Sequence, residues 1–217
     1  MQKGVEKMSK KEFRTFNIEK MEIRKSEEEP AKIIGHAAVF DQLSKPMGGF
    51  REQIRKGAFK ETIKTADVRA LWNHNSDKVL GRTKSGTLTL REDETGLYVE
   101  IVPPDTSWAK DAIISIDRGD VDQMSFAFRT EIDEWDESDS DNVIRTLVQL
   151  DLNDGDVSPV TYPAYPQTST NVRSAEDIYS DYLDSKSQAD DEERESNIKL
   201  EQEKRERQIK LLESEMI

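Results

Sequence analysis

Residues 117–129 read Asp-Arg-Gly-Asp-Val-Asp-Gln-Met-Ser-Phe-Ala-Phe-Arg, and from Val121 onward they predict a buried strand. The large apolar side chains alternate along one face of this strand: Met124, Phe126 and Phe128. Ser125 and Ala127 face the other way, and two small side chains on one face leave a hollow with a hydroxyl on its wall. A serine in a strand is usually a packing residue, so any chemical role for Ser125 depends on the rest of the chain.

Alternating and continuous apolar patterns predict further strands on both sides of this one. These predicted strands lie at residues 13–23, 32–40, 67–74, 83–92, 96–102 and 143–152. Residues 83–92 and 96–102 form a hairpin. Residues 156–165 are extended as well, and their prolines place them at a sheet edge or at the rim of a barrel.

Helical spacing of apolar residues predicts two helices, at residues 57–65 and 107–118, and Gly119 is placed to end the second one. Many short strands with two inserted helices indicate an α+β fold. We expect a mainly antiparallel, β-barrel-like domain with a few peripheral helices.

The acidic segment 130–142 predicts a solvated loop. Calcium binding is the weaker alternative, because the oxygen ligands lack the spacing and the glycine of an EF-hand.

The two ends of the chain differ in character from its middle. Residues 1–12 are charged and lack a pattern, so they predict a flexible N-terminal arm. Residues 13–173 contain the predicted strands and helices and form the expected domain. Residues 174–217 carry 14 acidic and 7 basic side chains and predict a polar C-terminal tail, partly helical, that is either disordered or an exposed helix.

Composition excludes several classes of protein. The chain has no cysteine, which excludes thiol catalysis, disulfides and thiolate metal sites. Its two histidines are too few for a histidine-rich zinc site. We therefore expect no metal and no cofactor. The net charge of −13, without a basic cluster, argues against binding to nucleic acid. The apolar runs are too short for a membrane span, so we expect no membrane association.

The order of polar residues along the chain fits serine hydrolase chemistry. His74 ends a predicted strand among small polar residues, whereas His36 lies inside an apolar strand, so His74 is the better candidate for a base that activates Ser125. Acidic residues in the last strands could hold the imidazole in place. From the residues alone, a non-catalytic barrel module remains the favoured interpretation and a serine hydrolase the alternative.

Several blocks between residues 33 and 166 occur in the order known from one protease family. The blocks are GHAAVF (35–40), GAF (57–59), VRALWNHN (68–75), VLGR (79–82), PDT (104–106), RGDV (118–121), MSFAF (124–128), DVSPVT (156–161) and YPAY (162–165). With them the chain resembles the prohead (head maturation) proteases of tailed bacteriophages. That family is related in fold to the herpesvirus capsid-assembly proteases.

The resemblance implies a serine endopeptidase with Ser125 as nucleophile and His74 as general base. It implies Asp156 as the third member of the triad, because the family carries an acidic residue just before the Val-Ser of the final block. Glutamate is frequent there and aspartate is shorter, so Asp151 remains an alternative. For the oxyanion, backbone N–H groups are the default donors, with Arg129 or Arg145 as helpers.

The resemblance also implies the place and partners of the reaction. Such enzymes act inside the immature capsid, the prohead, in the host cytoplasm. Their substrates are the scaffold, or the scaffold-like extension of the major capsid protein, and the protease itself. A homo-oligomer is compatible with this function.

The competing interpretation is a non-catalytic capsid scaffold or adaptor protein with the same barrel. A carbohydrate-active hydrolase is disfavoured, because aromatic residues make up only 7% of the chain.

Overall fold

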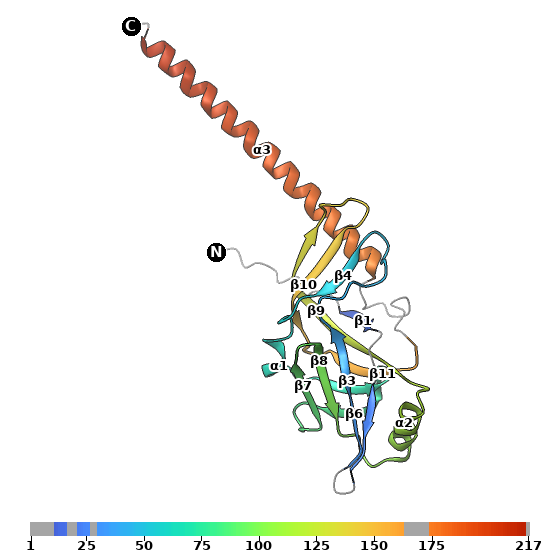
Figure 1. The fold of residues 1–217 in the computed structure, drawn as a ribbon. Coiled ribbons are helices and arrows are strands. Elements are labelled where there is room, and N and C mark those ends of the chain that lie inside the picture. The colour runs from blue at the N-terminus through green and yellow to red at the C-terminus, as the bar shows by residue number, and fades with distance from the viewer. Residues whose placement is uncertain (1–10, 17–20, 27–29, 163–173, 216–217) are drawn as a thin grey trace. The chain divides into compact units, whose positions relative to one another are not determined.

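The computed structural model describes residues 11–16, 21–26, 30–162 and 174–215 (Figure 1). The chain divides into two compact units, Met1–Ser174 and Ala175–Ile217. The predicted strand over residues 13–23 is described at both ends, but residues 17–20 lie outside the described part, as do most of the predicted arm and residues 163–173.

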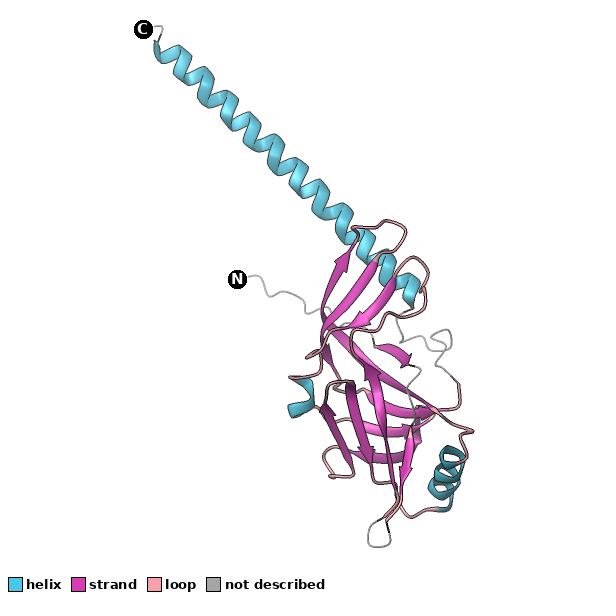
Figure 2. Ribbon diagram, in the orientation of Figure 1, coloured by secondary structure: helices cyan, strands magenta, loops and turns pink. Residues whose placement is uncertain are grey.

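The described part of the first unit contains strands from residue 12 to residue 160 and two helices (Figure 2). The strands are β1 (Glu12–Phe16), β2 (Glu22–Arg24), β3 (Lys32–Val39), β4 (Arg51–Ile54), β5 (Arg69–Trp72), β6 (Asn75–Arg82), β7 (Leu88–Glu92), β8 (Gly96–Ile101), β9 (Gln123–Asp136), β10 (Ile144–Asp151) and β11 (Asp156–Val160). The helices are α1 (Thr62–Thr65) and α2 (Ser107–Asp117).

These strands form two sheets. The larger has seven strands in the order β4-β10-β9-β11-β5-β6, with β1 also paired to β9, and the smaller has four in the order β2-β3-β8-β7. Most pairs are antiparallel, and the β10–β4 and β11–β5 pairs are parallel. The predicted α+β, mainly antiparallel fold is confirmed, although the two sheets do not close into a barrel.

Strand β9 is the central element of the larger sheet, because it changes partners along its 14 residues. Residues 124–128 pair with β1 and residues 123–126 with β11, so residues 124–126 lie between these two strands. The part from Arg129 to Asp136 pairs with β10. Ser125 therefore has a neighbouring strand on each side. The prediction of a loop at 130–142 is wrong for residues 130–136. Their acidic side chains alternate with others along a strand, where Trp135 packs on Phe50 with ring centroids 5.1 Å apart.

The prediction that residues 156–165 form a sheet edge is also wrong in its described part, because β11 lies inside the sheet between β9 and β5. Pro159 is tolerated there because the ladder with β5 covers only Asp156 and Val157. Beyond that ladder, the Pro159 carbonyl accepts a hydrogen bond from the Asn73 N–H (3.0 Å), so the missing proline N–H interrupts no strand pairing on that side.

Two local predictions need correction as well. Residues 57–65 predicted a helix, but only Thr62–Thr65 are helical, after a series of turns. The strand β6 was not predicted, since its first residues are exposed and polar and only Leu80 and Gly81 are buried. The predicted helix at 107–118 and the hairpin of β7 and β8 are confirmed, and Gly119 follows α2 with a φ of 80°.

The apolar core contains the large side chains of β9, as the alternation predicted. Phe126 lies 4.8 Å from the Phe128 ring and 5.6 Å from the Phe59 ring, measured between centroids. Met124 is also fully buried, and Ile33 and Leu97 bring the smaller sheet into the same cluster.

The second unit is one helix, α3 (Ala175–Glu215), of 41 residues. Its described side chains beyond Leu183 are exposed and mostly charged. Of the two forms expected for the tail, the structure therefore has the exposed helix. No helix in the described part of the chain is both long and apolar enough to cross a membrane.

Candidate active site

Ser125 lies in the middle of three adjacent strands. It pairs with Thr15 of β1 on one side and with Ser158 of β11 on the other. Directly paired residues project from the same face of a sheet, as do residues two apart in one strand. Phe13 and Asp156 therefore share the face of Ser125.

His74 occupies the turn between β5 and β6. Asn73 and His74 both have positive φ, 54° and 56°, and as the two residues between the paired Trp72 and Asn75 they fit a type I′ hairpin turn. Asn73 anchors this turn to the end of β11: its Oδ1 accepts from the Thr161 N–H (2.8 Å) and its Nδ2 donates to the Thr161 Oγ1 (3.1 Å). A left-handed backbone is uncommon for histidine, and such conformations concentrate at functional sites.

The carboxylate of Asp156 faces His74. Its Oδ1 lies 2.6 Å from the His74 Nδ1 and accepts a second hydrogen bond from the Ser158 hydroxyl at 2.5 Å. A carboxylate can only accept, so His74 Nδ1 carries the proton and the neutral ring keeps its lone pair on Nε2. Gly155 precedes Asp156, and a Cβ there would lie 2.1 Å from the Ala127 carbonyl oxygen, so only glycine allows this close approach.

The two remaining polar atoms of this cluster have no hydrogen-bond partner. Among the described residues, the buried His74 Nε2 and Ser125 Oγ are both unsatisfied. Leaving a buried polar group unpaired costs roughly 1–3 kcal/mol, so native structures rarely do so without a functional reason. A lone pair on Nε2 and a hydroxyl are the base and the nucleophile that acyl transfer requires, and their hydrogen bond is often long or absent without substrate.

The hollow beside Ser125 is filled rather than open. Ser125 is 0% and Ala127 1% exposed, so the hollow predicted on this face of the strand is closed to solvent. The aromatic ring of Phe13 stands edge-on to the His74 imidazole at a centroid distance of 4.9 Å. Sequence patterns placed Phe13 in a strand but carried no signal for this contact, because the two residues are 61 positions apart.

The other acidic candidate, Asp151, lies in different surroundings. Its Oδ1 accepts from the N–H and the Nδ2 of Asn153 (2.9 and 2.7 Å) and from the Thr62 hydroxyl at 3.3 Å. Arg129, a suggested oxyanion helper, lies 3.9 Å from the Asp151 carboxylate and donates to the Asn153 carbonyl. These contacts hold the loop between β10 and β11, so the structure brings Asp156 and not Asp151 to His74.

The second histidine also contacts an aspartate. His36, on β3, has its Nε2 at 2.9 and 3.0 Å from the two carboxylate oxygens of Asp93. Burial alone would raise the pKa of Asp93, but the hydrogen bonds from His36 and from the Gly96 and Thr95 N–H groups lower it below its usual value. This pair stabilises the turn between β7 and β8 in the smaller sheet.

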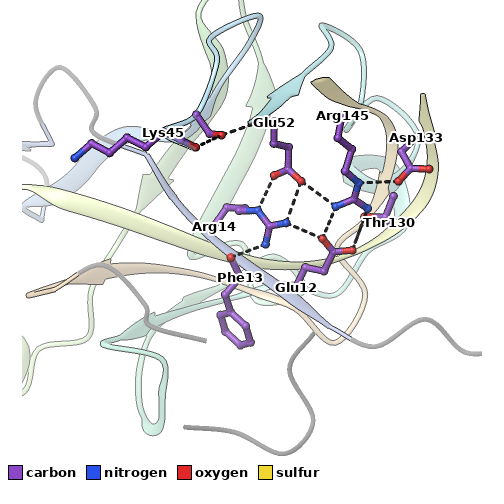
Figure 3. Close-up of polar contacts among 9 residues, drawn as sticks. Glu12, Phe13, Arg14, Lys45, Glu52, Thr130, Asp133 and Arg145 are labelled. Carbon is purple, nitrogen blue, oxygen red and sulfur yellow. Dashed lines mark hydrogen bonds and ion pairs between the residues drawn. The ribbon is translucent and has the colours of Figure 1, made fainter. Parts of the chain in front are cut away.

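A buried network of charges lies on the opposite face of β9 (Figure 3). Glu12 and Arg14 of β1 meet Glu52 of β4 and Arg145 of β10, and the ion pairs between guanidinium and carboxylate are 2.6 to 2.9 Å long. Arg145 also donates to Asp133 at 2.7 Å. It is therefore held away from the Ser125 face, contrary to its suggested role as an oxyanion helper.

The network shifts the pKa of each residue that joins it from β1. Burial alone would raise the pKa of Glu12, but the charges of Arg14 and Arg145 and the hydrogen bonds from Arg145 and Thr130 lower it to about 2. Burial alone would lower the pKa of Arg14, whereas Glu52 and Glu12 raise it above the usual value. Sequence patterns did not indicate this network, since its members come from three distant segments.

The part of the chain that the structure describes contains no group of three or more histidine, aspartate or glutamate side chains placed to hold a metal ion.

Comparison with known proteins identifies one family. The family model of the caudovirus prohead serine proteases matches residues 19–180. This range contains His74, Ser125 and Asp156, and it begins after β1. No curated protein and no solved structure matches the chain significantly.

Proposed function

Because this chain belongs to the family of caudovirus prohead serine proteases, we propose that it is a serine endopeptidase of phage head maturation that uses Ser125, His74 and Asp156. The observation that carries this proposal is the hydrogen bond between Asp156 Oδ1 and His74 Nδ1 (2.6 Å). This bond directs the lone pair of His74 to Nε2, which is buried and unsatisfied, as is Ser125 Oγ. The register of β9 and β11 puts Ser125 and Asp156 on one face of the sheet.

In this reaction the Ser125 oxygen attacks the carbonyl carbon of the scissile peptide bond, and its proton passes to His74 Nε2. Asp156 remains ionised and stabilises the imidazolium that forms. His74 then gives the proton to the leaving amine as the C–N bond breaks, which leaves an acyl ester on Ser125. Water, deprotonated by the same imidazole, hydrolyses the ester and regenerates the hydroxyl.

The proposed substrates are the scaffold, or the scaffold-like extension of the major capsid protein, and the chain itself. Family membership supports capsid substrates and action inside the prohead within the host cell. We assign catalysis to residues 13–173 and propose that the tail at 174–217 serves incorporation into the prohead or self-processing. We also propose that the domain is related in fold to the herpesvirus capsid-assembly proteases.

A second candidate function, a non-catalytic capsid scaffold or adaptor, is favoured by one observation. Ser125 has no exposed surface, and a side chain that no substrate reaches performs no hydrolysis.

Co-expression with the major capsid protein and scaffold of the same phage, followed by intact-mass analysis, separates the two functions. We expect capsid fragments from the wild type and none from Ser125→Ala or His74→Ala. His36→Ala is the matched control, because His36 also contacts an aspartate, and it should still cleave. Intact capsid protein in all samples would favour the scaffold, and cleavage by Ser125→Ala would contradict the proposed nucleophile.

A further inference from the structure

The strand β1 lies beside β9 (Figure 1). It pairs with the segment of β9 that contains Ser125. The two strands are antiparallel, with Thr15 opposite Ser125 and Phe13 opposite Ala127. Extended peptides commonly bind proteins as an added strand, in which backbone hydrogen bonds give affinity and alternate side chains give specificity. An endopeptidase needs such a peptide beside its nucleophile, and here part of the chain itself lies in that position.

The side chains of β1 alternate between two different surroundings. On the face of Ser125, the Phe13 ring covers the His74 imidazole at 4.9 Å. On the other face, Glu12 and Arg14 enter the charged network, and Figure 3 shows the Phe13 ring directed away from that network. Glu12 and Arg14 thus supply two charges to one face of the sheet, while Phe13 and Thr15 project from the face of Ser125.

The rest of the network belongs to the body of the domain. Arg145 and Glu52 are 1% and 2% exposed and lie 2.8 Å apart, and each also contacts a charge of opposite sign from β1. If β1 left the sheet, these buried groups would lose Glu12 and Arg14. A strand that brought an acidic residue and, two positions later, a basic one would replace both partners, whereas exchanged charges would put like charges together.

We propose that β1 occupies the substrate site as an intramolecular strand, and that this site selects an acidic and a basic residue two positions apart through Arg145 and Glu52. Cleavage of a separate chain then requires β1 to leave β9. This inference rests on the proposed protease function and adds a regulatory strand and a substrate class to it. The family match begins at residue 19, after β1, so the strand lies outside the matched segment.

The first test measures how fast a fluorophosphonate probe labels Ser125 in the full chain. Arg14→Glu faces Glu12 and Glu52 with a like charge and should release β1. If β1 is docked more than about 90% of the time, labelling should accelerate about tenfold or more, because reactivity scales with the open fraction. Arg24→Glu is the control: it makes the same charge change at an exposed residue, 3.8 Å from Glu100, and should label as the wild type does.

A second variant covers the case in which Arg14→Glu does not fold. Phe13→Ala removes only the ring beside His74 and should also accelerate labelling. Tyr98→Ala is the control, because it removes the ring that stands edge-on to the other histidine, His36, at 5.7 Å, and it should label as the wild type does. Equal rates in wild type, Phe13→Ala and Tyr98→Ala, all folded, would overturn the inference. No labelling in any variant would instead overturn the protease function itself, and the inference with it.

The selectivity is tested by competition with peptides. An eight-residue peptide containing Glu-Phe-Arg-Thr should slow labelling of the Phe13→Ala variant, and the charge-exchanged peptide with Arg-Phe-Glu-Thr should not. The ratio of protecting concentrations should be about tenfold or more, as for a specificity built on buried charges. Equal protection by both peptides would exclude Arg145 and Glu52 as determinants.

Discussion

Two buried polar clusters lie on opposite faces of β9 and differ in how completely their groups are paired. In the network of Glu12, Arg14, Glu52 and Arg145, each charged group contacts an oppositely charged one. In the cluster of His74, Asp156 and Ser125, the Nε2 and the hydroxyl have no partner. Complete pairing offsets the cost of burying charge. Unpaired groups cost stability, but they remain able to form hydrogen bonds with a substrate. We therefore expect loss of stability from changes on the first face and loss of activity from changes on the second.

The largest expected effect is on catalysis, from Asp156→Asn. An amide can donate to His74 Nδ1 and so favour the tautomer with the proton on Nε2, which cannot accept the proton of Ser125. We expect kcat/KM for a capsid-derived peptide to fall roughly 10⁴-fold, as for loss of the tautomer in other triads. Asp151→Asn, which changes a carboxylate bonded to Asn153, should leave kcat/KM nearly unchanged. The reverse result would make Asp151 the third member.

The next effect is on stability, from Arg145→Met. This change leaves Glu12 and Glu52 buried with one cation instead of two, so the free energy of unfolding in urea should fall by about 3–5 kcal/mol. Arg55→Met is the matched control, because Arg55 also forms a bidentate pair, with Glu134, but at an exposed site. Its cost should be far smaller than that of Arg145→Met, because solvent screens an exposed pair. Similar losses of unfolding free energy in both variants would show that burial does not set the cost of losing an arginine.

The same face should make stability depend on pH. The pKa of Glu12 is about 2 in the folded chain, against an ordinary value of 4.5. Because the unfolded chain binds this proton first as the pH falls, the stabilisation is complete above about pH 5.5 and is lost between about pH 5 and pH 2. Between pH 5 and pH 3 the loss should be about 2 kcal/mol.

Urea titrations of the wild type and Glu12→Gln at several pH values isolate this contribution, because the other carboxylates titrate in both proteins. The difference in unfolding free energy between the two should shrink as the pH falls. A constant difference would show that Glu12 has an ordinary pKa.

The smallest expected effect concerns the two serines that pair across β9 and β11. Ser125→Ala removes a buried hydroxyl without a partner and should raise the free energy of unfolding by about 1 kcal/mol. Ser158→Ala removes a hydroxyl that donates to Asp156 and should lower it by about the same amount. Thermal unfolding of both variants tests the contrast, and a destabilised Ser125→Ala would mean that its hydroxyl is satisfied in solution.

Sequence patterns predicted well those features that depend on neighbouring residues. The helix α2 and the hairpin of β7 and β8 follow from apolar spacing within a few residues, and both are confirmed. Predictions of a segment's position within the sheet were less accurate. The prolines of β11 indicated an edge, but Pro159 lies where the pairing with β5 has ended, and that pairing joins residues 87 positions apart.

By itself, the sequence determined the alternation of β9, the histidine at a strand end and the family blocks, because each depends only on the local order of residues. The tertiary structure decided which acid meets His74, since that contact joins residues 82 positions apart and depends on the turn at Asn73 and the register of β11. It also decided that Glu12 and Arg14 are buried and that Phe13 covers His74. Charged residues enter a core only where distant segments supply their partners, and no local pattern records that pairing.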